Sequence, residues 1–386
     1  MTLKTGDWVE VRSKQEILVS LDSKGRLDGL PFMPEMFQYC GQRFKVYKRA
    51  HKTCDTVNGT GGRRLPGGIH LDLRCDGKAH GNCDAACLLF WKEAWLKPVK
   101  GPEQPIELQS CTTGDENGES ASGGGCAEQD VRNATSRQLL GETRYVCQAT
   151  ELPHYTSRLR WWNIFQYVED YRSGNVSAGR LIRGFVYASF SELCHRLSRL
   201  APLLQWLYDR VQAPWGGIPY PRRKGTIPVG QATLSSTLNL QPGDLVRVKS
   251  YKSILETLDS ANKNAGLFFD AELVPYCGGT YRVRARIRQF VDERSGEMSF
   301  LRTPAVILEH VWCQSRYSAC RMLCPRSIYS WWREAWLERV SEEAGAVAVK
   351  PPRAVEEAGR SMPVGRPTSP VAAHLSSEPQ SEARLD

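Results

Sequence analysis

The sequence has no run of apolar residues long enough to span a lipid bilayer, so it predicts no membrane span. It also lacks the apolar core of a signal peptide, because its first residues, MTLKTGDWVEV, are polar and pass at once into an alternating strand pattern. Thirteen cysteines in a chain without a secretion signal are typical of free thiols or metal ligands in a reducing compartment. We therefore expect a cytoplasmic protein.

Recognisable catalytic motifs are absent as well. No G-x-x-x-x-G-K-[ST] or G-x-G-x-x-G loop precedes a helix, and the seven histidines are scattered. The acid of one local motif, Asp28-Gly29-Leu30-Pro31, is replaced by Ala265 where the motif recurs. The sequence therefore favours a non-catalytic protein. A thiol- or metal-dependent enzyme stays open as an alternative, and it would need a Cys83 or Cys87 of depressed pKa.

The chain contains a long internal repeat. GDWVEVRS at 6–13 returns as GDLVRVKS at 243–250, and WKEAWL at 91–96 returns as WREAWL at 332–337. The triplet Tyr39-Cys40-Gly41 returns as Tyr276-Cys277-Gly278. The shift is 237 positions both at the first glycine and at this cysteine. We therefore predict two related domains, a first copy at 1–100 and a second copy at 242–342.

The segments outside the two copies differ in composition. Residues 101–150 are rich in Gly and Ser and carry three Lys/Arg against eight Asp/Glu, which predicts an acidic linker. A helical segment is expected at 151–212, with Ser177 as an N-cap and a break near Pro202. A Pro/Gly linker follows at 213–241, and the Pro-, Ala-, Ser- and Glu-rich tail at 343–386 is expected to be disordered.

Within the helical segment, apolar residues recur at helical spacing from 182 to 211. One interpretation is a pair of helices that covers a domain face. The other is a seam for self-association, although such a seam normally needs several unbroken heptads.

Each copy has a strand at its Gly-Asp, a long irregular loop, several short strands and a last strand with a one-turn helix, which resembles a small SH3-like barrel. The ending FWKEAWLKPV resembles the close of the barrel in the β subunit of nitrile hydratase. This resemblance implies a fold and no activity, because the metal motif of that enzyme's α subunit, two cysteines followed by Cys-Ser-Cys, is absent. GRLDGLPFMPEM with RAHKTCD also resembles an uncharacterised bacterial family.

The predicted fold class is therefore mixed α and β, with two small SH3-like β-barrels related by duplication, joined by a linker and a helical middle segment. A competing interpretation concerns the end of each copy. Ile328, Trp331, Trp332, Trp336 and Val340 also fit one helical face, so the last element could be a helix.

Cysteines carry most of the chemical signal. A structural zinc site needs four ligands, and each copy offers four cysteines. They are Cys40, Cys75, Cys83 and Cys87 in the first copy, with His80 among them, and Cys277, Cys313, Cys320 and Cys324 in the second, with His310 nearby. Zinc is thus the candidate cofactor. The alternative is that these are reduced cysteines filling a small core. The equivalence of the two sets is open, because an ungapped match from WREAWL pairs Cys83 with Cys324 and Cys87 with Ile328.

A basic strand in the second copy, TYRVRARIRQF, alternates arginines with apolar residues and so places four guanidinium groups on one face. Such a ridge could contact nucleic-acid phosphates. It could equally be a solvated face whose arginines pair with Glu293 or Glu297. The candidate residues are Arg282, Arg284, Arg286 and Arg288, with Lys45 and Arg49 on the corresponding face of the first copy.

The leading hypothesis is a non-catalytic binding or accessory protein whose tandem SH3-like domains dock an unknown partner protein. Exposed aromatics around Pro31–Met36 would form the contact surface, and Trp95 and Trp336 would hold the barrel ends. Nucleic-acid binding through the ridge and a thiol- or metal-dependent enzyme are the alternatives.

Overall fold

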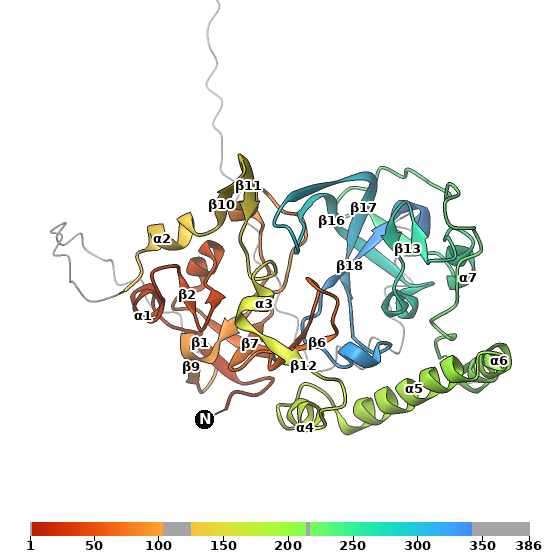
Figure 1. Ribbon diagram of the computed structural model, residues 1–386, viewed down its shortest axis with the longest axis horizontal. Coiled ribbons are helices and arrows are strands. Elements are labelled where there is room, and N and C mark those ends of the chain that lie inside the picture. The colour runs from red at the N-terminus through yellow and green to blue at the C-terminus, as the bar shows by residue number, and fades with distance from the viewer. Residues whose placement is uncertain (1, 103–124, 214–216, 342–386) are drawn as a thin grey trace, which may run out of the picture.

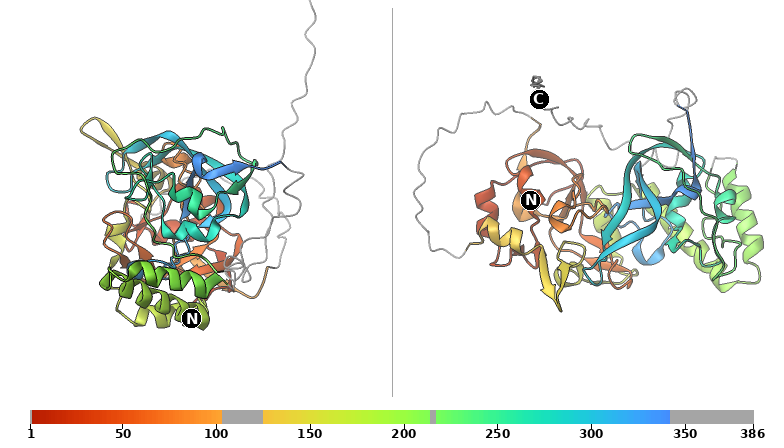
Figure 2. Two further views of the ribbon diagram at one scale, coloured as in Figure 1. Left: turned by 90° about the vertical axis from the view of Figure 1, so that its right-hand side faces the viewer. Right: turned by 90° about the horizontal axis from the view of Figure 1, so that it is seen from above.

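The computed structural model of the protein describes residues 2–102, 125–213 and 217–341. The predicted disordered tail and parts of both predicted linkers lie outside these ranges. The fold is mixed α and β, with several small antiparallel sheets. Two groups of strands lie side by side, one from each copy, and the helices α4 to α6 run along one side of the molecule (Figure 1; Figure 2). None of the helices in the described ranges is both long and apolar enough to traverse a bilayer.

The first copy forms a five-stranded antiparallel sheet in the order β8-β7-β4-β1-β9. Its strands are β1 (Trp8–Val11), β4 (Arg43–Arg49), β7 (Gly68–Leu71), β8 (Trp91–Lys92) and β9 (Leu96–Val99). The long connection from β1 to β4 contains the helix α1 (Lys14–Ser20), the strands β2 (Arg26–Leu27) and β3 (Leu30–Pro31), and the 3₁₀ helix η1 (Pro34–Tyr39). A single 3₁₀ turn, η3 (Glu93–Trp95), joins β8 to β9.

The second copy repeats this order with its own strands, as β18-β17-β16-β13-β19. They are β13 (Leu245–Val248), β16 (Thr280–Val291), β17 (Met298–Trp312), β18 (Tyr329–Arg333) and β19 (Leu337–Arg339). The connection again contains a helix, α7 (Tyr251–Leu255), two short strands, β14 (Lys263–Asn264) and β15 (Leu267–Phe268), and a 3₁₀ helix, η5 (Ala271–Tyr276). A 3₁₀ turn, η7 (Glu334–Trp336), follows β18, so a longer helix does not form at this end.

Within the described ranges, no closed barrel is present, because the edge strands of each five-stranded sheet do not pair with each other. The two sheets nevertheless agree strand by strand in order and direction.

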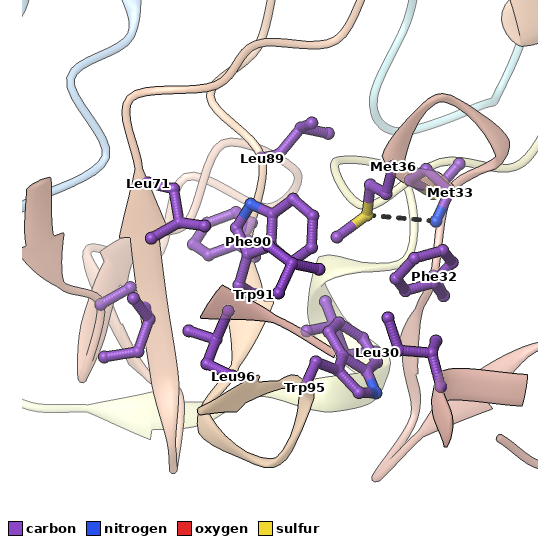
Figure 3. Packing of buried hydrophobic residues seen from close by; sticks show 14 of the residues in the cluster. Leu30, Phe32, Met33, Met36, Leu71, Leu89, Phe90, Trp91, Trp95 and Leu96 are labelled. Atoms are coloured by element: carbon purple, nitrogen blue, oxygen red, sulfur yellow. Dashed lines mark hydrogen bonds between the residues drawn. The ribbon is translucent and has the colours of Figure 1, made fainter. Parts of the chain in front are cut away.

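Both cores are built around the same aromatic arrangement. The rings of Phe32 and Trp95 meet edge to face with their centroids 5.1 Å apart, and those of Phe269 and Trp336 meet in the same way at 5.1 Å. Both tryptophans are fully buried, and the first copy's cluster is drawn in Figure 3. Edge-to-face aromatic pairs add stabilisation beyond their buried area. The recurrence of WKEAWL and WREAWL is therefore explained by a shared packing requirement.

The glutamate of the same motif anchors the chain just before the first strand of each copy. Glu93 Oε1 accepts the backbone N–H of Leu3 at 3.2 Å, and Glu334 Oε1 accepts that of Leu240 at 3.1 Å. These leucines lie 237 positions apart, the shift found in the sequence. A carboxylate that accepts backbone N–H groups stabilises a segment that has no strand partner there.

The predicted contact surface around Pro31–Met36 is wrong, because all six of these residues are buried. Phe32, Met33 and Met36 point into the core that holds Trp95 (Figure 3). The Met33 N–H donates to Met36 Sδ at 3.3 Å, which fixes the start of η1. Aromatic and methionine side chains in this connection cover the open face of the sheet instead of facing a partner.

The middle of the chain contains more regular structure than a linker and a helical segment. Residues 125–150 include α2 (Glu128–Asn133) and a hairpin of β10 (Ser136–Leu139) and β11 (Glu142–Tyr145). After α3 (Leu152–Tyr155), β12 (Ser157–Leu159) pairs with β6 (Gly62–Arg64), which in turn pairs with β5 (Lys52–Cys54).

Three helices follow, α4 (Phe165–Arg172), α5 (Ala178–Arg196) and α6 (Ala201–Gln212). The predicted N-cap is confirmed, since Ser177 Oγ accepts the Arg180 N–H at 3.3 Å. The predicted restart is also confirmed, because α6 has Pro202 in its first turn, where a missing N–H costs no helical hydrogen bond.

Polar contacts join the two copies. Asp84 Oδ2 accepts the backbone N–H groups of Arg288 at 2.8 Å and Gln289 at 3.1 Å. Arg326, which is 2 % exposed, donates to Thr56 Oγ1 at 2.7 Å. A buried ion pair between Lys52 and Asp170, at 2.5 Å, ties α4 to the first copy. The contacts of Asp84 and Arg326 thus tie the cysteine-containing loop of each copy to the opposite copy.

Candidate metal centre and binding surfaces

Three side chains of the first copy converge on one buried point. They are Glu35 from η1, Cys75 from the segment after β7, and His80 from the short 3₁₀ helix η2 (Lys78–His80), and their ligand atoms all lie within 4.8 Å of one another. The side chains of Glu35 and His80 are 4 % and 2 % exposed. Glu35 Oε1 and His80 Nε2 are 3.8 Å apart, which is longer than a hydrogen bond.

The loop that carries Cys75 and His80 is wound tightly by glycines. Gly77 has a φ of 72°, and a Cβ there would lie 2.0 Å from the carbonyl oxygen of Cys83. Only glycine can occupy this left-handed position without displacing the backbone. The Gly77 N–H also donates to Cys75 Sγ at 3.3 Å, which holds the sulfur toward the convergence point. Backbone constraints at Gly77 therefore help to set the geometry of this loop.

Four polar atoms at this point are buried without a hydrogen-bond partner. They are both carboxylate oxygens of Glu35 and both ring nitrogens of His80. Buried polar groups are nearly always satisfied, and each one left unpaired costs about 1–3 kcal/mol. Burial alone raises the pKa of Glu35, but the neighbouring His80 and Cys75 outweigh it and lower the pKa overall. Burial and the Glu35 charge strongly raise the pKa of Cys75. The cluster thus has acceptors in excess, as a cation would require.

A cavity of about 40 Å³ adjoins the cluster. Since a water needs roughly 10–15 Å³ of such volume, the cavity has room for a small ligand or water next to an ion. Its walls include Cys83, Cys87 and Cys147 together with apolar side chains. Burial raises the pKa of Cys87 to about 12 and that of Cys147 to about 11, so these thiols are neutral near pH 7. The Glu35–Cys75–His80 group could therefore hold a metal ion with one position facing this cavity.

The structure separates the other predicted cysteine ligands. Cys83 and Cys87 line the cavity but do not belong to the three-residue group, and Cys40 packs against the first core at the end of η1. In the second copy, Cys277 takes the place of Cys40 beside its own core. The three remaining cysteines of the second copy lie apart from this group: Cys313 is half-buried, Cys320 is exposed and Cys324 is buried.

The hydrogen-bond register resolves how the cysteine loops correspond. The Cys75 N–H donates to the carbonyl of Cys87, whereas the Cys313 N–H donates to the carbonyl of Ile328. Cys87 therefore corresponds to Ile328, as the ungapped match from WREAWL indicates, and the two C-x3-C pairs are not equivalent.

Glu35 does have a counterpart in the second copy. Glu272 lies 237 positions later in η5 and is 1 % exposed. Its Oε1 accepts the backbone N–H of Tyr317 at 2.6 Å, and burial raises its pKa. Both glutamates therefore face the loop between the third and fourth strands of their sheets. In the second copy one oxygen of the glutamate accepts a backbone N–H and the other, Oε2, is buried without a partner, whereas in the first copy neither oxygen has a partner and the glutamate faces Cys75 and His80.

The arginine ridge forms the predicted alternation, with Val283 and Ile287 buried and most of the arginines exposed. The expected pairing with Glu293 and Glu297 does not occur, because Glu293 pairs with Arg326 and Glu297 with Arg144. Three of the ridge arginines have other contacts within the protein. Arg282 donates to the carbonyl of Gly243, Arg284 lies over the ring of Tyr329, and Arg286 donates to Asn239 Oδ1; Arg288 is exposed.

The corresponding face of the first copy is not a continuous basic surface. Arg49 is 9 % exposed and is held by Glu93 and by Glu169 of α4, so it has no room for a phosphate. Lys45 lies over the ring of Trp8. The basic ridge thus belongs to the second copy alone.

The helical segment presents a large exposed apolar surface. One side of the helical pair is covered, because it packs against Tyr317 and its neighbours through Tyr187, Phe190, Leu204 and Tyr208. The other side, here called the α5–α6 apolar face, is between 42 % and 63 % exposed at each residue. It consists of Ile182, Val186, Leu193, Leu197, Leu200, Leu203, Trp206, Leu207 and Val211.

Sequence reasoning missed Glu35, which gave no signal beyond its recurrence at Glu272, and it placed His80 in the loop without assigning it as a ligand. It also missed Cys147, which lies far from the other cysteines in the sequence.

Comparison of the chain with protein-family models, with curated proteins and with solved structures found no match.

Proposed function

We propose that this is a non-catalytic binding protein made of two SH3-like barrels related by duplication, and that it assembles through the α5–α6 apolar face. The fold part of the proposal is supported by the shared strand order and by the 3₁₀ turn before the last strand of each sheet. The single observation that carries the binding part is the exposure of this apolar face. Large contiguous apolar patches on proteins mark interaction sites.

A second copy of the chain is the occupant that fits best. A stable interface buries roughly 800 Å² on each partner. The 19 residues of α5 give it a length of about 28 Å, and α6 packs beside it to widen the face. A face used by both subunits of a dimer must complement itself. The rim meets this need with charges of both signs, in the Glu192–Arg196 and Asp209–Arg223 pairs.

Sedimentation velocity of the purified protein tests the proposal. Wild type is expected to sediment as a dimer at tens of micromolar. Val186→Glu combined with Leu207→Glu is expected to give a monomer, because both side chains lie on the face and their substitution buries charge at the interface. Leu140→Glu is the matched control, since Leu140 is 96 % exposed in the β10–β11 turn, away from α5 and α6, and the dimer should persist.

Two results would overturn the proposal. One is a wild type that remains monomeric at these concentrations. The other is a monomer that floats with phosphatidylserine vesicles and loses this binding on Val186→Glu, which would assign the face to a lipid surface.

Zinc is the metal proposed for the Glu35–Cys75–His80 group, with a structural role. Thiolate, imidazole and carboxylate are the ligands that zinc takes in proteins, and zinc would supply the positive charge that the orphaned atoms lack. The group ties η1 to the loop after β7, so an ion there would hold the first copy's connection onto its sheet.

A further inference from the structure

The helix α4 and the turn before it expose an apolar surface that the function proposed above does not use. Six large side chains of this segment, each between 41 % and 72 % exposed, form what is here called the α4 aromatic face. They are Trp161, Trp162, Ile164, Phe165, Val168 and Tyr171. Phe165, Val168 and Tyr171 follow one another at intervals of three residues, which places them on one side of α4. The helix lies at the lower edge of the molecule, outside both groups of strands (Figure 1).

The opposite side of α4 is polar, and it is buried. Gln166 and Asp170 are 6 % and 0 % exposed, and the Asp170 carboxylate pairs with Lys52 of the first copy at 2.5 Å. A surface helix of a globular protein normally buries its apolar side instead. A buried ion pair also adds little net stability compared with apolar packing. Stability therefore does not account for the orientation of α4, whereas a function for the outward-facing apolar side chains does.

The turn that carries the two tryptophans is held by side chains of α4. The Gln166 side-chain amide donates to the carbonyls of Arg160 and Asn163, both at 3.0 Å. The Tyr167 hydroxyl donates to the carbonyl of Trp161 at 2.7 Å. Groups that are already fixed lose less conformational entropy on binding than mobile groups do. The α4 aromatic face is therefore preorganised for contact with another surface.

The charges available around this face are positive. The carboxylates of Glu169 and Asp170, the two acids of α4, are already paired with basic residues of the first copy. Three exposed arginines form no ion pair among the described residues, and they are Arg158, Arg160 and Arg172. The Arg160 guanidinium lies over the Trp162 ring, 5.2 Å from its centroid, so one cation is directly beside the exposed indoles. The surface that complements the face is therefore apolar and anionic.

A membrane rich in anionic lipid combines both properties. Tryptophan and tyrosine favour the boundary between lipid headgroups and acyl chains, because their rings are apolar and carry a polar N–H or O–H group. Arginine side chains extend their charge from this depth to the lipid phosphates, and each one near an anionic surface strengthens binding about fivefold. A second copy of the chain does not complement the face, because it would bring like charges together.

We propose that the α4 aromatic face binds the surface of membranes that contain anionic phospholipids. In the bound state the apolar side chains of the face lie at the depth of the headgroups, and the three arginines contact phosphates. This contact does not use the α5–α6 apolar face, so a dimer measured without lipid neither supports nor contradicts it.

Flotation of the full chain with lipid vesicles tests this proposal. The protein is expected to float with vesicles of phosphatidylcholine and phosphatidylserine, and to stay in solution with vesicles of phosphatidylcholine alone. Added salt should weaken the binding, because it screens the arginine charges. Trp162→Glu combined with Phe165→Glu should lower the affinity about a hundredfold or more, since removing each ring from water contributes roughly tenfold or more.

The controls separate lipid binding from folding. Trp162 and Phe165 are exposed, so their double variant should unfold at the same denaturant concentration as wild type. Leu140→Glu is the matched control, because Leu140 is also exposed but lies in the β10–β11 turn at the opposite edge of the molecule, and this variant should float like wild type (Figure 1). Neutralising Arg158 and Arg172 as glutamines should weaken binding about fivefold for each charge removed.

The proposal is overturned if wild type does not float, or floats equally well without phosphatidylserine. A wild type that fails to float but binds a single-stranded oligonucleotide through Trp162 and Phe165 would assign the face to nucleic acid. Flotation that survives Trp162→Glu with Phe165→Glu also overturns it. If that flotation is lost in Val186→Glu with Leu207→Glu, the lipid contact belongs to the α5–α6 apolar face.

Discussion

Glutamine in place of Glu35 isolates the proposed zinc site, because it keeps the shape of the side chain and removes its charge. Both Glu35 oxygens are buried, and His80 and Cys75 lower the pKa of Glu35, so removing its charge should cost the metal-free protein some stability. Zinc binding should suffer strongly, since the ion would lose one of three protein ligands. The expected signature is therefore a folded variant whose stability does not respond to zinc.

The magnitude follows from linkage. Zinc at a hundred times its Kd stabilises the wild type by about 2.7 kcal/mol. Removing a group that supports a metal site typically weakens metal binding by up to about a hundredfold. With zinc binding weakened by that factor, the same zinc concentration stabilises Glu35→Gln by only about 0.4 kcal/mol. Guanidinium unfolding followed by tryptophan fluorescence, with and without zinc, measures both values.

Glu272→Gln is the matched control, because Glu272 occupies the same position in the second copy but accepts the Tyr317 N–H and belongs to no candidate metal group among the described residues. Weakening that one hydrogen bond should cost about 1 kcal/mol with or without zinc. The zinc response of this variant should equal that of wild type.

The pH dependence of binding supplies a second readout. Burial and the Glu35 charge raise the pKa of Cys75, so zinc must displace the Cys75 proton when it binds. One proton released per ion means that zinc affinity falls about tenfold for each pH unit of acidification. An equal zinc response in Glu35→Gln and wild type would refute the assignment, as would a zinc affinity independent of pH.

Other expected outcomes concern stability. Asp170→Leu leaves the Lys52 ammonium buried without its carboxylate and should lower the free energy of unfolding by about 3–5 kcal/mol; adding Lys52→Met should restore most of it. Burial lowers the pKa of His70 to about 3, so between about pH 6.5 and about pH 3 only the unfolded chain binds a proton there. The free energy of unfolding of the wild type should therefore fall by about 1.4 kcal/mol for each pH unit of acidification in this range. His70→Ile, which introduces the residue found at the corresponding Ile307, should remove that part of the slope in acid titrations of stability. Trp336→Ala should cost about 3–5 kcal/mol in denaturant unfolding, and a loss below 1 kcal/mol would contradict its place in the core.

The sequence could predict the order of the elements because the repeat preserves spacing and packing residues together. Trp95 and Trp336 recur because each closes a core against a phenylalanine from the connection after the first strand. The same logic fails for Pro31–Met36. Its aromatic and methionine residues lie in a turn-rich segment, and only the tertiary fold reveals that this segment is folded back over the sheet.

The candidate metal centre was only partly predictable. Cysteine spacing identified Cys75, but the C-x3-C pattern suggested an equivalence that the strand register does not support, because Cys87 stands where the second copy has Ile328. Glu35 is one glutamate in a 3₁₀ helix and has no local pattern to distinguish it.

The two copies keep one buried glutamate in different surroundings, and among the described residues only the first copy's glutamate belongs to a candidate metal group. A buried carboxylate must be compensated by donors or by a cation. In the second copy, the loop between β17 and β18 turns the Tyr317 N–H toward Glu272 Oε1, and Oε2 is buried without a partner. In the first copy, Gly77 shapes the loop that carries Cys75 and His80 to Glu35, and neither Glu35 oxygen has a hydrogen-bond partner. A glutamate with a neutral thiol and an imidazole remains short of positive charge, which a divalent ion would supply.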